Sequence, residues 1–165
     1  MMEKLLVDED LTTRALMLAM KYHGEQLDKA GMPYTDHLLR VGMRSGFKAA
    51  TREEFKVLMA IGLLHDILED TSLTFKELEI EIQNKTVSDA VLLLTRLDNQ
   101  KYMDYIDLVS HNTLATMVKL SDLEDHLETL NGYTLPESLS KRYKKAKQRL
   151  LLSNEYLKNE YEESL

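Results

Sequence analysis

The chain has 165 residues, of which 44% are hydrophobic, and it contains no cysteine. This length suits a single domain, and the lack of cysteine excludes disulfides, thiolate metal sites and cysteine nucleophiles. A formal charge of −7 argues against bulk binding to nucleic acid or to anionic membranes. The longest apolar run, residues 57–64, is too short for a membrane span. The acidic N-terminus is untypical of a signal peptide, so we expect a soluble, cytoplasmic protein.

Helical patterns dominate the chain, and no apolar–polar alternation is long enough to predict a sheet. Thr51 with Glu54 and Thr74 with Glu77 are capping-box patterns, which predict helix starts. In chain order, the predicted helices are 11–22, 34–48, 51–70, 74–82, 88–96, 102–110, 114–130 and 137–160. The sequence therefore predicts one all-α domain over residues 1–165, a compact bundle of about eight helices.

The segment 63–70 carries an unusual group of polar residues at the end of an apolar helix. His65 and Asp66 are adjacent there, and Glu69 and Asp70 follow about one turn later. Charges that are buried without partners are costly, and acids at a helix C-terminus oppose the helix dipole. A divalent metal ion would bring the imidazole and the carboxylate together. The alternative is an ordinary helix end, with a core histidine followed by solvated acids.

Two other segments favour the metal. His37 follows a Gly–Pro loop at the start of a predicted helix, and Lys119 and Asp122 lie in a mostly apolar helix. Together with His65 and Asp66, these residues supply two imidazoles and two carboxylates from three helices. Such a site leaves positions open for water and suits Mn, Fe or Zn.

In this combination the segments resemble the HD superfamily of metal-dependent phosphohydrolases. Within it they resemble the alarmone hydrolases, which remove the 3′-pyrophosphate from guanosine tetraphosphate. The family pattern is H-x-x-Q, G-x-P-Y-x-x-H, L-L-H-D-x-x-E-D, L-T and V-K-x-x-D, and it occurs in this order within residues 12–150. The matching residues are His23, Gln26, Gly31, Pro33, Tyr34, His37, His65, Asp66, Glu69, Asp70, Leu94, Thr95, Lys119 and Asp122.

The resemblance implies a stand-alone HD-domain hydrolase that acts on a nucleotide with a 3′-phosphate or 3′-pyrophosphate. Guanosine tetraphosphate is the first candidate substrate. It implies that Glu69 and Asp70 position water and transfer protons. The implied ligands of one Mn²⁺ or other divalent transition-metal ion are His37, His65, Asp66 and Asp122. Candidate substrate contacts, two of them from a basic run more typical of an exposed helix face, are Lys29, Lys119, His126, Thr129, Lys141 and Arg142.

Three positions depart from the family pattern. Asp28 stands where the family usually has an arginine that packs on the guanine base, and His126 stands where it has an asparagine. Leu123 replaces an arginine that is common in close relatives. These departures leave open a phosphohydrolase of another nucleotide and a non-catalytic domain that binds a nucleotide or a metal. A helical interaction module without a ligand is a third alternative. The presence of both Glu69 and Asp70 favours catalysis.

Overall fold

The computed structural model describes residues 10–128 and 133–153, and within these ranges the chain is all-α. No strand forms there, and Leu27 and Pro33 make an isolated β-bridge. The helices are α1 (Leu11–His23), α2 (Tyr34–Gly46), α3 (Arg52–Leu64), α4 (Ile67–Asp70), α5 (Phe75–Ile82), α6 (Lys85–Leu94), α7 (Tyr102–Val109), α8 (Thr113–Leu127) and α9 (Glu137–Ser153). The predicted all-α fold is confirmed. Among these described helices, none combines the length and the apolar character that a membrane span requires.

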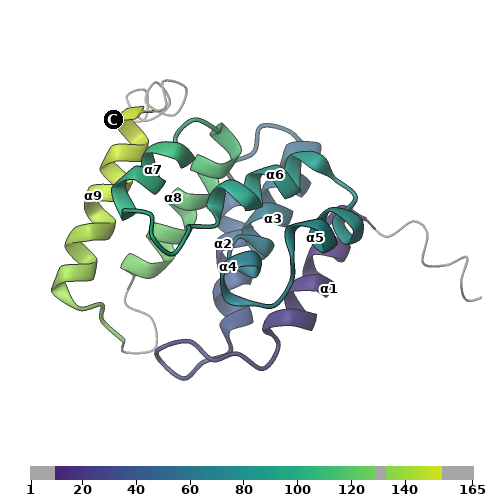
Figure 1. The fold of residues 1–165 in the computed structure, drawn as a ribbon, viewed down its shortest axis with the longest axis horizontal. Coiled ribbons are helices and arrows are strands. Elements are labelled where there is room, and N and C mark those ends of the chain that lie inside the picture. The colour runs from purple at the N-terminus through teal and green to yellow at the C-terminus, as the bar shows by residue number, and fades with distance from the viewer. Residues whose placement is uncertain (1–9, 129–132, 154–165) are drawn as a thin grey trace, which may run out of the picture.

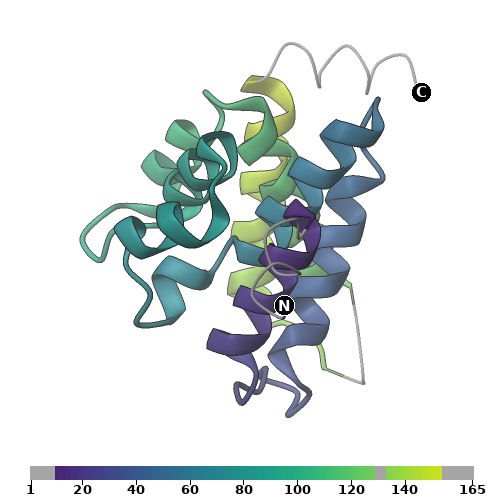
Figure 2. The ribbon, with the colours of Figure 1, turned by 90° about the vertical axis from the view of Figure 1, so that its right-hand side faces the viewer.

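Helix α3 lies at the centre of the bundle. It packs against α1, α2, α6 and α8, and α8 in turn packs against α2 and α9 (Figure 1). Figure 2 shows the shorter helices α4 to α7 gathered on one side of α1, α2 and α3. The side chains of α3 from Leu58 to Leu64 are all buried, so this helix forms the middle of the hydrophobic core.

Helices α2 and α3 approach each other most closely where two glycines meet. A Cβ atom added to Gly62 would lie 2.6 Å from the Cα atom of Gly42 and 2.9 Å from its backbone nitrogen. A side chain at position 62 would therefore require a helix to move, whereas a Cβ atom at Gly42 would meet its nearest neighbours, in Met59 and Leu63, at 3.2–3.3 Å. Because the two helices run antiparallel, this contact also sets the distance between His37, in the first turn of α2, and His65, just after α3.

Side-chain caps explain where several helices begin. Thr74 and Glu77 form the complete capping box that the sequence predicts at α5. Helix α6 begins at Lys85, three residues before the predicted start, because the Asn84 side chain accepts a hydrogen bond from the backbone N–H of Val87. Asparagine is among the preferred N-cap residues, so this start was readable from the sequence.

The prediction of one helix over residues 51–70 was wrong near its C-terminal end. Helix α3 ends at Leu64, and the backbone at Asp66 has φ −102° and ψ 0° before α4 begins. The His65 ring bonds the carbonyl of Gly62 at 2.7 Å, which satisfies an end group of α3. Adjacent residues in a regular helix project about 100° apart. The break allows His65 and Asp66 to face the same point.

The predicted ends of the last two helices have different outcomes. Helix α8 ends at Leu127, before the predicted residue 130, because Glu128 is already extended, with φ −75° and ψ 140°. The predicted end of the last helix, at residue 160, lies outside the described residues. On α9, Ala146 and Leu150 are buried.

Replacing Gly62 with alanine is expected to destabilise the fold by about 1–3 kcal/mol, because the added methyl group would overlap the backbone of α2. Without this contact, the same change in a helix would stabilise it by about 1 kcal/mol. Urea unfolding followed by circular dichroism measures the difference. Gly42→Ala, whose methyl group would meet Met59 atoms at 3.2 Å, is the milder comparison. A Gly62→Ala variant as stable as the parent would contradict the proposed tight packing.

Candidate functional site

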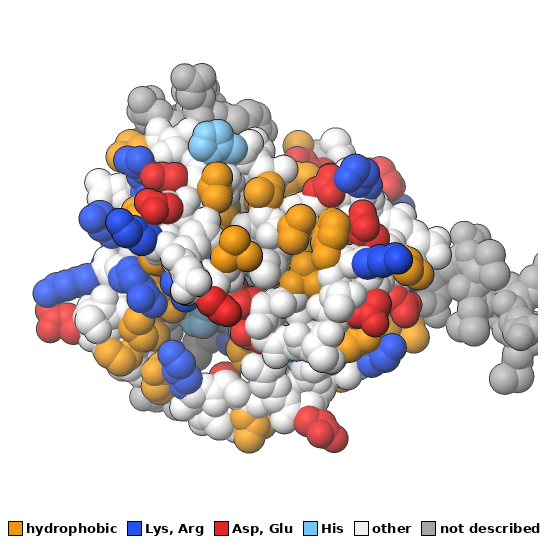
Figure 3. Space-filling view, in the orientation of Figure 1, with side chains coloured by type: hydrophobic (Ala, Val, Ile, Leu, Met, Phe, Trp, Pro, Cys, Tyr) orange, Lys and Arg blue, Asp and Glu red, His pale blue; other side chains and the backbone are white. Residues whose placement is uncertain are grey.

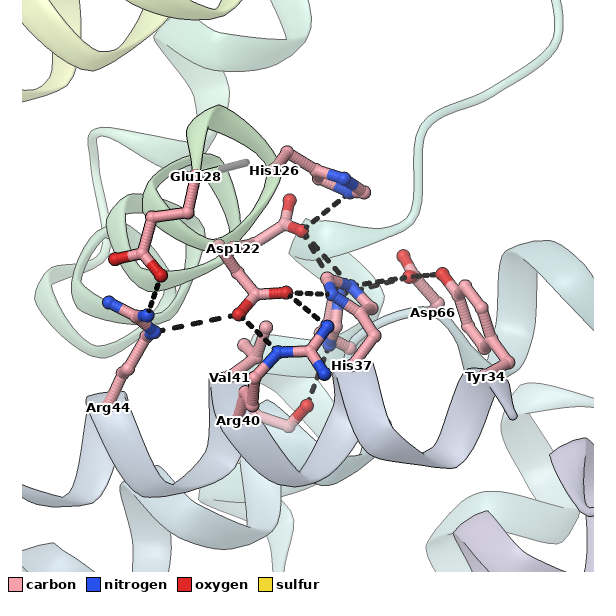
Figure 4. Close-up of polar contacts among 12 residues, drawn as sticks. Tyr34, His37, Arg40, Val41, Arg44, Asp66, Asp122, His126 and Glu128 are labelled. Carbon is pink, nitrogen blue, oxygen red and sulfur yellow. Dashed lines mark hydrogen bonds and ion pairs between the residues drawn. The ribbon is translucent and has the colours of Figure 1, made fainter. Parts of the chain in front are cut away.

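The four side chains predicted as metal ligands meet at one point between α2, the α3–α4 junction and α8 (Figure 4). Asp122 Oδ1 lies 3.4 Å from His37 Nε2 and 3.5 Å from His65 Nε2. Asp66 Oδ2 lies 3.0 Å from His65 Nε2 and 3.9 Å from His37 Nε2. The three helical segments therefore bring the predicted set together.

In both histidines the hydrogen bond of Nδ1, which faces away from the cluster, fixes the orientation of the ring and leaves Nε2 facing the cluster. His65 Nδ1 lies 2.7 Å from the Gly62 carbonyl oxygen, and His37 Nδ1 lies 2.8 Å from a carboxylate oxygen of Asp125. A carbonyl or carboxylate oxygen only accepts, so each Nδ1 carries a proton, and in the neutral ring, the form that binds a metal, each Nε2 presents a lone pair. Both lone pairs point to the centre of the cluster.

Three buried atoms at this centre have no hydrogen-bond partner in the described part of the chain: His37 Nε2, His65 Nε2 and Asp122 Oδ1. Buried polar atoms left unpaired are costly, so their convergence calls for a positive group among them. Metal–ligand bonds of about 2.0–2.2 Å place neighbouring donor atoms about 3–3.5 Å apart. The observed spacings match this geometry, and the nitrogen and oxygen donors suit a divalent transition metal.

Asp125, which the sequence analysis did not single out, holds His37 in place. Its carboxylate accepts hydrogen bonds from His37 Nδ1 and, at 2.7 and 3.0 Å, from the guanidinium of Arg40. Burial raises the pKa of Asp125, but the bonds from His37 and Arg40 outweigh burial and lower it to about 2. A second acid one turn after Asp122 on a mostly apolar helix was the sequence signal for this role.

The carboxylates of the cluster have further partners. Lys119 Nζ lies 2.7 Å from Asp122 Oδ2, and the Tyr34 hydroxyl donates to Asp66 Oδ2. Burial raises the pKa of Asp122, but Lys119 above all holds it well below the usual range. Both acids are therefore held in the charged form that binds a cation.

A cavity of about 500 Å³ opens above the cluster. Figure 3 shows this hollow, with a histidine at depth and lysine or arginine side chains at its edge. Of the predicted substrate contacts, those that line the cavity are Lys29, Lys119, His126 and Arg142. Lys141 is not among the lining residues, since it is exposed and its ammonium group pairs with Glu137 at 2.6 Å. Thr129 lies outside the described residues.

Glu69 and Asp70 lie in the wall of the cavity, on α4. The backbone N–H of Asp70 bonds the Asp66 carbonyl at 2.9 Å, so Asp70 follows Asp66 by one turn, as expected. Glu69 Oε2 accepts a hydrogen bond of 2.9 Å from the backbone N–H of Arg96, which fixes its carboxylate. Burial, together with the charges of Asp66 and Glu69, raises the pKa of Asp70 to about 6.

Asp28 has a structural role in the loop before α2. Its Oδ1 atom accepts hydrogen bonds from the backbone N–H groups of Ala30 and Met32, at 2.8 and 2.9 Å. Gly31, with φ +80°, completes this turn, and the loop lines the cavity. The Asp28 carboxylate is therefore committed to its own loop. Beside the loop, buried His23 bonds Gln26 through Nδ1 at 2.7 Å and ties the end of α1 to it.

The chain is similar in sequence to bacterial guanosine-3′,5′-bis(diphosphate) 3′-pyrophosphohydrolases. It is 33% identical to that of Aquifex aeolicus over 125 residues, which are 71% of this chain and 17% of the relative. It is 32% identical to that of Spiroplasma citri over 148 residues, which are 81% of this chain and 19% of the relative. A bifunctional (p)ppGpp synthase/hydrolase, SpoT of Escherichia coli, is 27% identical over 130 residues, which are 72% of this chain and 18% of SpoT. The chain thus spans less than a fifth of the length of these relatives.

A solved structure supports the same comparison. A metazoan ortholog of SpoT that hydrolyses ppGpp superposes with a TM-score of 0.68 at 22% identity, covering 94% of each chain. No protein-family model matches the chain. The structural likeness shows a shared fold. The sequence similarities confirm the resemblance to the alarmone hydrolases that the motifs predict.

Replacing Asp125 with asparagine is expected to weaken divalent metal binding by about 10–100-fold, because the amide no longer fixes the His37 ring through a charged hydrogen bond. Titration calorimetry with Zn²⁺ and Mn²⁺ measures the affinity, and circular dichroism checks the fold. Asp107→Asn is the matched control, since Asp107 is also paired with an arginine, Arg149, but on the exposed surface. Metal affinity equal to the parent's in folded Asp125→Asn would rule out this supporting role.

Proposed function

We propose that this chain is a divalent-metal-dependent phosphohydrolase, and that its substrate is guanosine 3′,5′-bis(diphosphate). The observation that carries the proposal is the convergence of three unpaired buried atoms, from His37, His65 and Asp122, at the floor of a cavity. The similarity to named 3′-pyrophosphohydrolases supports the choice of substrate. A single domain over residues 1–165 and a cytoplasmic location stay predictions from the sequence.

The residues that would hold the ion are His37, His65, Asp66 and Asp122. We propose Mn²⁺, because two imidazoles and two carboxylates form the mixed donor set that such an ion accepts. When bound, a divalent ion polarises a phosphoryl oxygen and makes water a stronger nucleophile. Asp125 and the Gly62 carbonyl keep the two imidazole rings oriented for this task.

Glu69 and Asp70 would serve the attacking water. The backbone N–H of Arg96 anchors the Glu69 carboxylate at the cavity wall, where it can orient water and accept its proton. Asp70 follows in the same short helix and would pass the proton on. Water attacks the phosphorus next to the ribose 3′-oxygen. The bond between this phosphorus and the 3′-oxygen breaks, and the oxygen takes up a proton. The products are guanosine 5′-diphosphate and pyrophosphate.

The walls of the cavity carry the groups that a phosphorylated nucleotide needs. Lys29 and Arg96 add positive charge, and the Arg142 guanidinium lies 4.8 Å from the centre of the Tyr102 ring. Cations bind phosphate oxygens, and tyrosine rings pack against a base. A volume of about 500 Å³ is within the range of small-molecule sites.

The test of the function is product release from a nucleotide panel in the presence of Mn²⁺. The panel contains guanosine 3′,5′-bis(diphosphate), guanosine 5′-triphosphate and a 3′-phosphorylated adenosine nucleotide. We expect pyrophosphate from the first compound and loss of the activity with a chelator. Turnover of a different member would keep the reaction class and change the substrate. Binding without turnover of any member would favour the non-catalytic alternative.

Replacing His65 with alanine is expected to abolish stoichiometric metal binding and turnover together, because one of the two inward lone pairs is removed. Metal analysis after gel filtration, with circular dichroism as the check on folding, measures this outcome. His111→Ala is the matched control, since His111 lies in an exposed turn and bonds the Asp107 carbonyl. Full metal content in His65→Ala would remove His65 from the ligand set.

Replacing Glu69 with glutamine keeps the shape of the side chain and removes its basic oxygen. Metal content should stay near the parent's, and turnover should fall by about 10²–10⁴-fold, the usual contribution of a general base. Steady-state rates at saturating Mn²⁺ measure the effect, with Glu81→Gln on the exposed face of α5 as control. Loss of the metal would make Glu69 a ligand. An unchanged rate would move the base to another residue, with Asp70 the first to test.

A further inference from the structure

His126 lies beside the proposed metal centre, at the position where the family pattern has an asparagine. It is one turn after Asp122 on α8, and its Nε2 atom lies 3.2 Å from Asp122 Oδ1. Its ring is 4.7 Å from the His37 ring and 5.6 Å from the Tyr143 ring, measured between centroids. The imidazole is therefore packed between these rings with Nε2 turned towards Asp122 (Figure 4).

Asp122 Oδ1 is the atom around which three imidazoles gather. The Nε2 atoms of His37, His65 and His126 lie 3.4, 3.5 and 3.2 Å from it. Among residues 10–128 and 133–153 this buried oxygen has no hydrogen-bond partner, so the His126 ring approaches it without directing an N–H at it. Such an approach is unfavourable for a hydrogen bond, but it is the spacing between two ligands of one ion.

The donor atoms of His126, His37 and Asp122 also form a compact triad. All three lie within 4.8 Å of one another, as do those of His37, His65 and Asp66. The two triads share His37, and Asp122 lies within 3.5 Å of His65, so they belong to one cluster. An ion placed in this cluster has His126 within reach, whereas the asparagine of the family pattern offers no imidazole.

We propose that His126 is a fifth ligand of the metal, so that this chain binds its ion with three imidazoles and two carboxylates. The inference rests on the proposed metal centre and deepens it. Imidazole suits Zn, Co and Ni more than Mn, and the usual order of affinity places Mn²⁺ lowest of these metals. A third imidazole therefore shifts this site towards the later transition metals relative to a site with the family's asparagine.

The decisive variant is His126→Asn, which restores the residue of the family pattern. Its affinity for Co²⁺ and Zn²⁺ should fall at least about tenfold, by analogy with losses measured around metal sites, while Mn²⁺ affinity should change less. Competition with a chromophoric chelator measures the affinities. The visible absorption of bound Co²⁺ reports the number of ligands and should change in intensity. His111→Asn is the matched control and should bind all three metals as the parent does.

The variants separate this inference from the proposed function. If the parent binds metal, His65→Ala does not, and His126→Asn matches the parent in affinity and Co²⁺ spectrum, the fifth ligand is refuted and the metal centre remains. A rise in KM alone in His126→Asn, with parental metal affinity, would make His126 a substrate contact and would also refute it. A parent that binds no metal would overturn both.

Discussion

The close packing of α2 on α3 is the constraint on which the site depends. Gly62 lies so close to the backbone at Gly42 that there is no room for a Cβ atom at position 62. His37 and His65 extend from the ends of these two helices, so the helix separation becomes the separation of two imidazoles. Helix α8 then packs on both α2 and α3 and adds Asp122 from the third side. The site thus takes its residues from two helices and the junction between α3 and α4.

The second constraint is charge, because the cluster buries several carboxylates inside an apolar bundle. Each has a compensating partner: Lys119 for Asp122, Arg40 for Asp125, and the Tyr34 hydroxyl for Asp66. These partners leave three atoms of the cluster unpaired. One oxygen of Asp122 and two imidazole nitrogens have no partner, and they face one another. Unpaired atoms from three side chains that face one another are expected of a binding centre, because an ordinary helix end would expose these groups to water.

Most of the fold and the centre of the site were predictable, because their signals are local or ordered along the chain. Apolar periodicity and the capping box at Thr74 gave helices close to the observed bounds. The motif order gave the four ligand candidates that the structure brings together. The break between α3 and α4 was not predictable, since residues 65–70 have no proline or glycine to mark it. Asp125 was missed because its partners, His37 and Arg40, are more than 80 residues away.

The departures from the family pattern become understandable once their contacts are known. Asp28 closes its own loop, because one of its carboxylate oxygens accepts hydrogen bonds from two backbone N–H groups. His126 faces Asp122, so on our proposal it belongs to the metal centre. Both positions that the pattern associates with nucleotide recognition thus serve other groups. Discrimination between nucleotides would then fall to the cavity walls, where Arg142 packs on Tyr102 and Tyr143 and Arg96 lies near Tyr102. A guanidinium between aromatic rings is held flat, and it can pack on a base or bind a phosphate without the arginine of the family's loop.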